Sequence, residues 1–242
     1  MAERGRRKGS EDFGEDSRRD LTLWVPKTDL GRKVKTGEIK NMHELLSLTV
    51  PIKEVEIVDM LLPEVTEEII KVGRVQRVTD SGRRTRFKVV MVVGNKDGYV
   101  GVGQAKGKES GPTIRRAIEK AKMSMKEVKR GCGSWECGCR TAHTVPFRVI
   151  GKGGSVRVTL KPAPKGTGLV SGEVAKKVMM LAGIKDVWVH TEGHPRTSLN
   201  FALAVLDALT QTNTVKISES DIPSLGIVVG PSMKQDGKAE AN

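Results

Sequence analysis

Four residues near the middle of the chain have side chains that could bind a metal ion. Cys132, Cys137 and Cys139, the three cysteines of the 242-residue sequence, are followed by His143 within the segment GCGSWECGCRTAH. Three thiolates and one imidazole would complete the tetrahedral shell of a structural Zn²⁺. The spacing C-x4-C-x-C-x3-H differs from the usual C-x2-C pair, although Gly138 would allow the sharp turn that it requires. Two interpretations stay open, a structural zinc site and three reduced thiols in a flexible linker.

A second group of residues could bind phosphate. The formal net charge is +13, and residues 64–130 alone hold 17 Lys and Arg against 8 Asp and Glu. A local excess of this kind predicts a polyanionic partner, with nucleic acid favoured over a membrane because no amphipathic anchor accompanies the charge. Aromatic residues make up only 3% of the chain, so stacking on bases would not be the main mode of recognition. The alternative is a charged surface that only keeps the protein soluble.

The cations of this stretch gather near predicted turns and on one predicted helix face. Arg83, Arg84 and Arg86 follow a predicted turn at residues 79–82, where guanidinium groups could bind phosphate in a bidentate manner. We predict that the following residues contact a phosphate backbone: Arg74, Arg77, Arg83, Arg84, Arg86, Lys88, Lys96, Lys106, Lys108, Arg115, Arg116, Lys122, Lys126, Lys129 and Arg130.

Strands and one helix must position these cations. A first strand is predicted within residues 64–79, and the alternation over residues 87–93 predicts a second, with one fully apolar and one partly apolar face. A turn at residues 95–98 leads to a third strand, and a helix begins at Pro112 with an apolar stripe that extends to Val128. The glycines at positions 101, 103 and 107 lack the spacing of nucleotide-binding loops and indicate close backbone approach to a partner or a bulge. The stretch therefore predicts a three-stranded meander packed on one helix.

A second α+β unit is predicted after the cysteine cluster. Residues 145–160 form a hairpin around a glycine-rich turn, and residues 162–168 a stiff loop with the letters PAPKGTG. A helix at residues 174–181, a strand at 184–189 and a helix at 198–209 complete an α+β sandwich. His190 and His194 are assigned to a loop, because Gly193 and Pro195 prevent them from sharing a helix face. No nucleophile–base set or phosphate-cradling loop is found, so we expect no enzyme activity.

The chain divides into five predicted segments. Residues 1–63 are an extension, mobile over 1–40 and followed by two short docking helices on either side of Pro51. Residues 64–131 form the nucleic-acid-binding domain, 132–143 the Cys/His linker, 144–213 the C-terminal α+β domain and 214–242 a tail. No apolar run of about 20 residues and no signal peptide is found. We therefore expect a cytoplasmic protein without a membrane partner.

Three pieces of the sequence resemble one known family. They are VVMVVGNKDGYVGVGQAKGKESGPTIRRAIEKAK, HTVPFRVIGKGGSVRVTLKPAPKGTG and EVAKKVMMLAGIKDV. Together they resemble small-subunit ribosomal protein S five of the archaeal and eukaryotic branch, over about residues 64–212. The resemblance implies an N-terminal fold similar to double-stranded-RNA-binding domains, and a C-terminal domain with a left-handed βαβ crossover. The cysteine cluster is not part of the family's shared core, so the family gives the zinc interpretation no support.

The resemblance also implies a function and partners. The protein would be a structural constituent of the small ribosomal subunit, bound to ribosomal RNA near the neck, the decoding region and the messenger entry, and would support translational accuracy and subunit assembly. Ribosomal proteins S four and S eight would be neighbours, and messenger RNA at the entry site is a further candidate partner. The loop that matches residues 78–87 would reach ribosomal RNA, while residues 162–168 and 174–181 would lie toward S four.

Two other classes of function remain as alternatives. One is a free-standing regulator that binds double-stranded RNA, and the other is an enzyme, since the C-terminal fold occurs in small-molecule kinases. In the favoured interpretation Lys and Arg neutralise phosphates and release counterions, so that affinity falls steeply with salt. A-form RNA would be recognised by shape and 2′-hydroxyl contacts, which suits a chain poor in aromatic residues.

Overall fold

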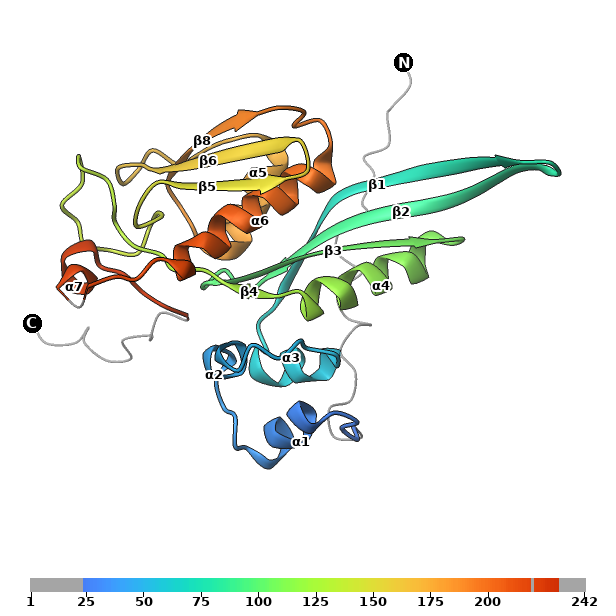
Figure 1. Ribbon diagram of the computed structural model, residues 1–242, viewed down its shortest axis with the longest axis horizontal. Coiled ribbons are helices and arrows are strands. Elements are labelled where there is room, and N and C mark those ends of the chain that lie inside the picture. The colour runs from blue at the N-terminus through green and yellow to red at the C-terminus, as the bar shows by residue number, and fades with distance from the viewer. Residues whose placement is uncertain (1–23, 219, 231–242) are drawn as a thin grey trace, which may run out of the picture.

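The computed structural model describes residues 24–218 and 220–230. Three short helices come first, α1 (Asp29–Thr36), α2 (Met42–Ser47) and α3 (Val55–Leu61). They pack below the first sheet, against the side that carries α4 (Figure 1). The two docking helices on either side of Pro51 are thereby confirmed as α2 and α3.

The prediction of a mobile segment over residues 1–40 is wrong for its second half. Trp24 is buried and its indole nitrogen donates to the carboxylate of Glu54 at 3.0 Å. The backbone N–H groups of Lys27 and Thr28 donate to the same carboxylate at 2.9 and 2.6 Å. One acidic side chain therefore anchors the chain that leads into α1, a long-range contact that composition cannot reveal. Residues 1–23 lie outside the described part.

The first sheet is an antiparallel meander with the order β1-β2-β3-β4. Its strands are β1 (Thr66–Thr79), β2 (Gly82–Gly94), β3 (Tyr99–Gly107) and the two-residue β4 (Lys126–Glu127). Helix α4 (Ser110–Met123) packs on one face. The predicted three-stranded meander and its helix are present, with β4 added at the edge. The helix begins two residues before Pro112 and ends before Val128, which is buried beyond it.

The second sheet has the order β5-β6-β8-β7. It consists of β5 (Val149–Gly153), β6 (Val156–Pro162), β7 (Leu169–Val170) and β8 (Val187–Glu192), with α5 (Glu173–Ala182) and α6 (Ser198–Thr214) packed on it. Strands β7 and β8 pair in parallel, so α5 makes the connection of a βαβ unit. A last short helix, α7 (Asp221–Leu225), follows. The α+β class with two sheets is confirmed. Every described helix is too short or too polar to cross a membrane.

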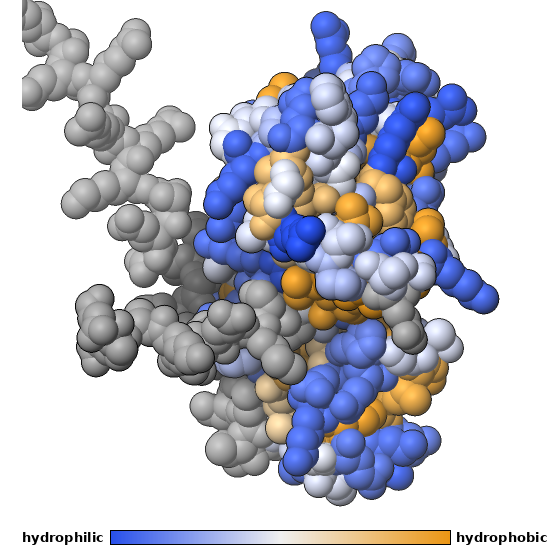
Figure 2. All heavy atoms as spheres, turned by 90° about the vertical axis from the view of Figure 1, so that its left-hand side faces the viewer, coloured by the Kyte–Doolittle hydropathy of each residue, from blue (hydrophilic) through white to orange (hydrophobic). Residues whose placement is uncertain are grey.

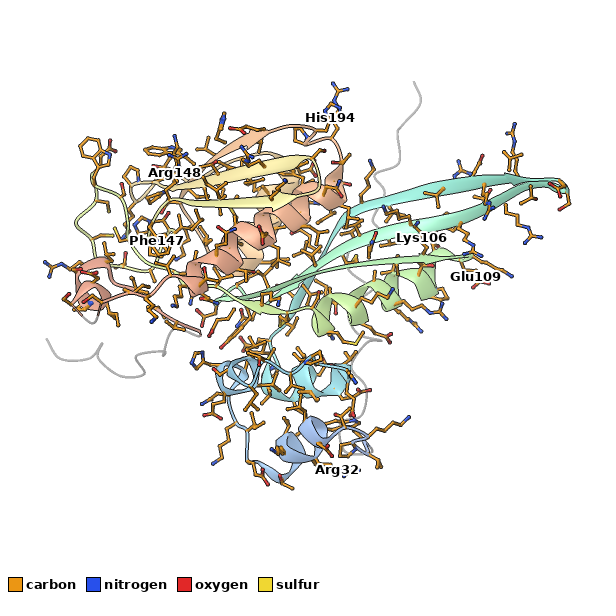
Figure 3. The ribbon with its side chains drawn as sticks, viewed as in Figure 1. Arg32, Lys106, Glu109, Phe147, Arg148 and His194 are labelled. Carbon is orange, nitrogen blue, oxygen red and sulfur yellow. The ribbon has the colours of Figure 1, made fainter. Side chains whose placement is uncertain are left out.

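The assignment of His190 to a loop is wrong. His190 lies in β8, opposite Thr159 of β6, and its ring is 3.7 Å from the Glu192 carboxylate. His194 does lie in the loop after β8 and is exposed (Figure 3). The predicted strand at residues 184–189 begins three residues before β8. The apolar run on which the prediction rested starts in the turn after α5. Among the described residues, neither histidine belongs to a group of three or more potential metal ligands.

Both faces of the first sheet are buried at its centre. Val89, Met91 and Val93 pack against α4 and the N-terminal helices. Val90 and Val92 point the other way and belong to the same apolar core as α5 and α6. The face predicted to be only partly apolar is thus covered by the C-terminal part of the chain. The two sheets share one continuous core, which fixes them to each other.

Glycines allow the helices to lie directly on the sheets. A Cβ atom at Gly101 or Gly103 would lie 2.2 and 2.3 Å from backbone oxygens of α4, closer than real Cβ contacts. The prediction of close approach to a partner, or of a bulge, is wrong in detail: the backbone that approaches these glycines is that of this chain's own helix α4, and the pairing of β2 with β3 has no register shift. Gly151 and Gly153 lie in the same way against the backbone of α6.

Candidate nucleic-acid interface and metal centre

The β1–β2 hairpin projects beyond the helices that cover the rest of the sheet (Figure 1). Its turn joins Thr79 to Gly82, as predicted, and almost all residues between Gly73 and Arg86 are exposed. Arg83, Arg84 and Arg86 therefore lie in strand β2 rather than in a loop, with the regular spacing of a strand. A strand holds its side chains in fixed directions, so the register decides which cations act together.

The strand register places five of the predicted cations on one side of the sheet. Directly opposed residues share a face in an antiparallel pair, and alternate residues of a strand share a face. Arg77 is opposed to Arg84, and Lys88 is opposed to Lys106. We call the following set the basic face: Arg77, Arg84, Arg86, Lys88 and Lys106. It continues, toward the hairpin tip, the side of β2 on which Val90 and Val92 pack against the C-terminal core.

None of the five forms an ion pair with another residue of the described chain, so their charge is not neutralised there. Like charges directly opposite each other in a sheet are destabilising. The opposed cations therefore do not stabilise the hairpin itself. This is expected of a surface that binds an anion.

The remaining predicted cations fall into separate groups. Arg74 and Arg83 lie on the opposite side of the hairpin from the basic face. Lys108, Arg115 and Arg116 are exposed around the beginning of α4, next to Glu109 and the labelled Lys106 (Figure 3). Three more predicted cations lie at the other end of the sheet, away from the hairpin. They are Lys96, Lys126 and Lys129. Lys129 is half-buried and donates to the carbonyl of Asn213 at 3.4 Å.

Two predicted cations have internal partners instead, and this is a correction. Lys122 is buried beneath the sheet, with its Nζ 2.8 Å from Asp59 and 3.6 Å from Glu67. Burial raises the pKa of Glu67, and the nearby Lys122 opposes that rise. Arg130 is also buried and donates to Asp97 at 2.6 Å and to the carbonyl of Gly230 at 3.0 Å. Helical spacing shows which residues share a face, but not which neighbour covers that face.

The opposite end of the molecule has a different surface. Seen from the side away from the hairpin tip, apolar side chains lie exposed among hydrophilic ones (Figure 2). Large hydrophobic residues exposed in the C-terminal part of the chain include Val215, Ile222 and Val229. This end therefore differs from the hairpin, whose exposed strands carry the basic face.

The four predicted metal ligands come together. One ligand atom from each of Cys132, Cys137, Cys139 and His143 lies within 4.8 Å of all the others. The thiol sulfurs of Cys139 and Cys132 are 3.4 Å apart, and the Cys137 sulfur is 3.8 Å from His143 Nε2. These separations suit four ligands around one ion with metal–ligand distances of about 2.0–2.3 Å. The cluster can hold a metal ion.

The thiols of the cluster differ in their acidity. Hydrogen bonds with Thr141 lower the pKa of Cys139 to about 6. Burial raises the pKa of Cys132 to about 11. A metal cation would favour the thiolate form of both, because a coordinating thiol is deprotonated by the ion. The buried Cys132 thiol would therefore lose its proton most readily with a cation at the centre of the cluster.

Asp186, from a distant part of the chain, contacts the histidine of the cluster. Its Oδ2 accepts a hydrogen bond from His143 Nδ1 at 2.8 Å, and both side chains are buried. A proton held on Nδ1 leaves the Nε2 lone pair toward the cysteines, the tautomer that a metal requires. The sequence analysis missed this residue, because 43 positions separate it from His143 and no local spacing links them.

Comparison with known proteins gives the same family for both halves of the chain. Residues 65–129 match the family model described as Ribosomal protein S5, N-terminal domain, and residues 151–222 match Ribosomal protein S5, C-terminal domain. The Small ribosomal subunit protein uS5 of Thermoplasma acidophilum is 51% identical over 214 residues, which are 88% of this chain and 97% of that protein. That of Methanothermobacter thermautotrophicus is 54% identical over 208 residues, 86% of this chain and 96% of the relative. The chain belongs to the ribosomal protein S5 family.

Proposed function

We propose that the protein is a structural, non-enzymatic constituent of the small ribosomal subunit that grips ribosomal RNA with its basic face. Membership of the family supports the assignment to the small subunit, since the relatives are named as small-subunit proteins. The observation that carries the RNA-binding role is the presence of two pairs of opposed cations, Arg77 with Arg84 and Lys88 with Lys106.

The chemistry follows from the spacing of a sheet. Opposed side chains lie about 5 Å apart and successive side chains on one face about 7 Å apart, so the basic face is a narrow row of cations. Such a row can follow a phosphate backbone, neutralise several phosphates and release their counterions. Specificity would come from the shape of one folded RNA site, because aromatic side chains for base stacking are scarce.

The finer partners are part of the proposal. We place the protein near the neck and the messenger entry of the subunit, beside ribosomal proteins S four and S eight, with the hairpin tip toward the decoding region. Support comes from the projecting hairpin, which could reach RNA away from the protein body (Figure 1). It also comes from the exposure of Lys165 and Gly166, which leaves this part of the PAPKGTG loop open to a neighbouring protein.

The test removes charge from the hairpin without touching the core. A variant with Arg83, Arg84 and Arg86 changed to Ala should bind small-subunit RNA more weakly, with a shallower salt dependence, and should enter small subunits poorly on a sucrose gradient. Arg157→Ala on β6, which removes a cation paired with Glu192, is the matched control. Normal incorporation of the triple variant would contradict the assignment. Sedimentation of the wild-type protein outside ribosomal particles would favour a free-standing RNA-binding regulator.

We also propose that the Cys/His cluster holds a structural Zn²⁺. The donor set, its separations and the Asp186–His143 contact support this, since metal-bound histidines usually donate their second N–H to a carboxylate. Bound zinc would crosslink residues 132–143, in the segment that connects the two sheets. Metal analysis of chelator-washed and zinc-reconstituted protein should find one tightly held zinc per chain. Changing Cys132 and Cys137 to Ser should abolish it, and a wild-type protein without retained zinc would end the proposal.

A further inference from the structure

We infer that Asp186 is a positioning residue that links the Cys/His cluster to the PAPKGTG loop, residues 162–168. When the cluster is filled, the loop would be fixed for contact with a neighbouring macromolecule. The inference rests on the proposed zinc site and adds a second residue and a consequence to it.

The two carboxylate oxygens of Asp186 have different partners. Oδ2 accepts from His143 Nδ1 at 2.8 Å. Oδ1 accepts from the backbone N–H groups of Gly166 and Gly168 at 3.1 and 2.8 Å. Asp186 itself is only 4% exposed, so water does not compete for these bonds. One buried side chain therefore joins a metal ligand to two amides of a surface loop that lies about 20 residues away in sequence.

The backbone around the cluster reinforces this link. The carbonyl of His143 accepts from the N–H groups of Lys185 and Asp186 at 2.9 and 3.1 Å. The hydroxyl of the next residue, Thr144, accepts from the N–H of Ala163 at the start of the loop, at 3.4 Å. A movement of His143 would thus be transmitted to Asp186 and to both ends of the loop.

Besides Asp186, the N–H of Val187 attaches the end of the loop by donating to the carbonyl of Gly168 at 3.1 Å. Gly166 and Gly168 adopt φ values of +94° and +75°, which only glycine reaches without strain, and glycine gives the unrestrained chain the greatest freedom. Within the loop, the hydroxyl of Thr167 donates a hydrogen bond to the carbonyl of Pro164 at 2.9 Å. This bond is local and does not attach the loop to the rest of the protein. The two amides on Asp186 are therefore the main attachment at the loop's centre.

A filled metal site would strengthen this attachment. Coordination through Nε2 fixes the plane of the imidazole ring and makes its Nδ1–H a better donor to the carboxylate. The carboxylate is then held in the orientation in which its other oxygen faces Gly166 and Gly168. The four ligands, among them the imidazole, and the carboxylate of Asp186 would then act as a single rigid unit beneath the loop.

The test measures the loop and the metal separately. Residue-resolved amide hydrogen exchange is compared for zinc-loaded protein, chelator-treated protein and Asp186→Asn, with zinc affinity taken from chelator competition. We expect Asp186→Asn to weaken zinc binding about 10–100-fold. Exchange at Gly166 and Gly168 should accelerate about tenfold or more in both altered proteins, the effect of losing hydrogen bonds to a charged group. The amide of Val158 in β6 should not change.

Glu192→Gln is the matched control, because it removes an exposed carboxylate at the end of β8, the strand that follows Asp186. It should leave the zinc affinity and the exchange rates of the loop amides unchanged. If the wild-type protein binds zinc but the loop amides exchange equally fast with and without it, the inference is overturned and the zinc proposal stands. If the wild-type protein binds no zinc, both fail.

Discussion

Arg77 on β1 and Arg84 on β2 face each other directly across the projecting hairpin, and neither forms an ion pair within the described residues. Two like charges in this position reduce the stability of the hairpin. This cost to the fold supports the proposal that the two arginines bind an external anion. The arrangement predicts a conflict between stability and RNA binding that mutation can expose.

Arg84→Glu should separate the two properties. The new carboxylate would lie opposite Arg77 and replace a repulsion by an attraction, so the free energy of unfolding should rise by about 0.2–1 kcal/mol. Affinity for small-subunit RNA should fall, and the slope of log K against log salt should decrease by about 1 or more. Chemical denaturation and salt-dependent binding assays measure the two effects.

Arg157→Glu provides the comparison, because it makes the same charge change on β6 and removes a pair with Glu192. It should gain no stability and should leave the salt slope unchanged. Equal losses of RNA affinity in both variants would show that only net charge matters, and would contradict a specific role for the basic face.

Lys122 should contribute to stability rather than to RNA binding. Lys122→Met leaves Asp59 and Glu67 without their cation in a largely buried site and should lower the free energy of unfolding by about 3 kcal/mol. Lys120→Met, two residues earlier on the same helix at an exposed position, should change it by less than about 0.5 kcal/mol. Should the Lys122 variant keep full stability but lose RNA affinity, the internal assignment would be wrong.

The contact between α4 and β3 should tolerate no side chain at Gly103. A Cβ atom there would lie 2.3 Å from the carbonyl oxygen of Ala117, so Gly103→Ala should push the helix from the sheet and cost about 1–3 kcal/mol of stability. Gly111→Ala in α4 has open space around it and should be neutral or stabilising by up to about 1 kcal/mol. Thermal unfolding of the pair checks this, and similar melting temperatures would contradict the close packing.

Docking of the N-terminal segment should depend on pH through Glu54. Burial opposes ionisation of this carboxyl, but hydrogen bonds from Thr28, Lys27 and Trp24 outweigh it and lower the pKa of Glu54 below its ordinary value of 4.5. A lowered folded-state pKa gives stability that is present above pH 4.5 and is lost as the pH falls through the lowered value. Fluorescence of Trp24, in a background with Trp135 and Trp188 changed to Phe, should report release only at acidic pH.

Glu54→Gln should weaken the docking already at neutral pH, by about 1–2 kcal/mol, and should remove most of the acid transition. Glu44→Gln changes an exposed carboxylate that accepts a hydrogen bond from the nearby Asn41, and should behave like the parent protein. An unchanged acid transition in the Glu54 variant would assign the titration to another group.

Local patterns predicted the elements of the fold well. Alternation gave β2, the turn residues gave its connection to β3, and helical spacing gave most of α4. The four cluster residues were found because they lie within twelve positions, where spacing alone limits the geometry. Patterns of this kind are set by a residue's near neighbours, and near neighbours are visible in a single sequence.

What the sequence could not decide were the contacts between distant segments. The sequence analysis placed Lys106, Lys122 and Arg130 in one set of predicted phosphate-binding cations. In the structure Lys106 is exposed. Lys122 is buried against Asp59 and Glu67, and Arg130 against Asp97. Asp186 reached His143, and Glu54 reached Trp24, only through the tertiary structure. Composition and spacing determined that the chain carries excess positive charge and a set of metal donors. The packing of remote elements decided which charges remain for a partner, because a charge is free only if no distant carboxylate folds against it.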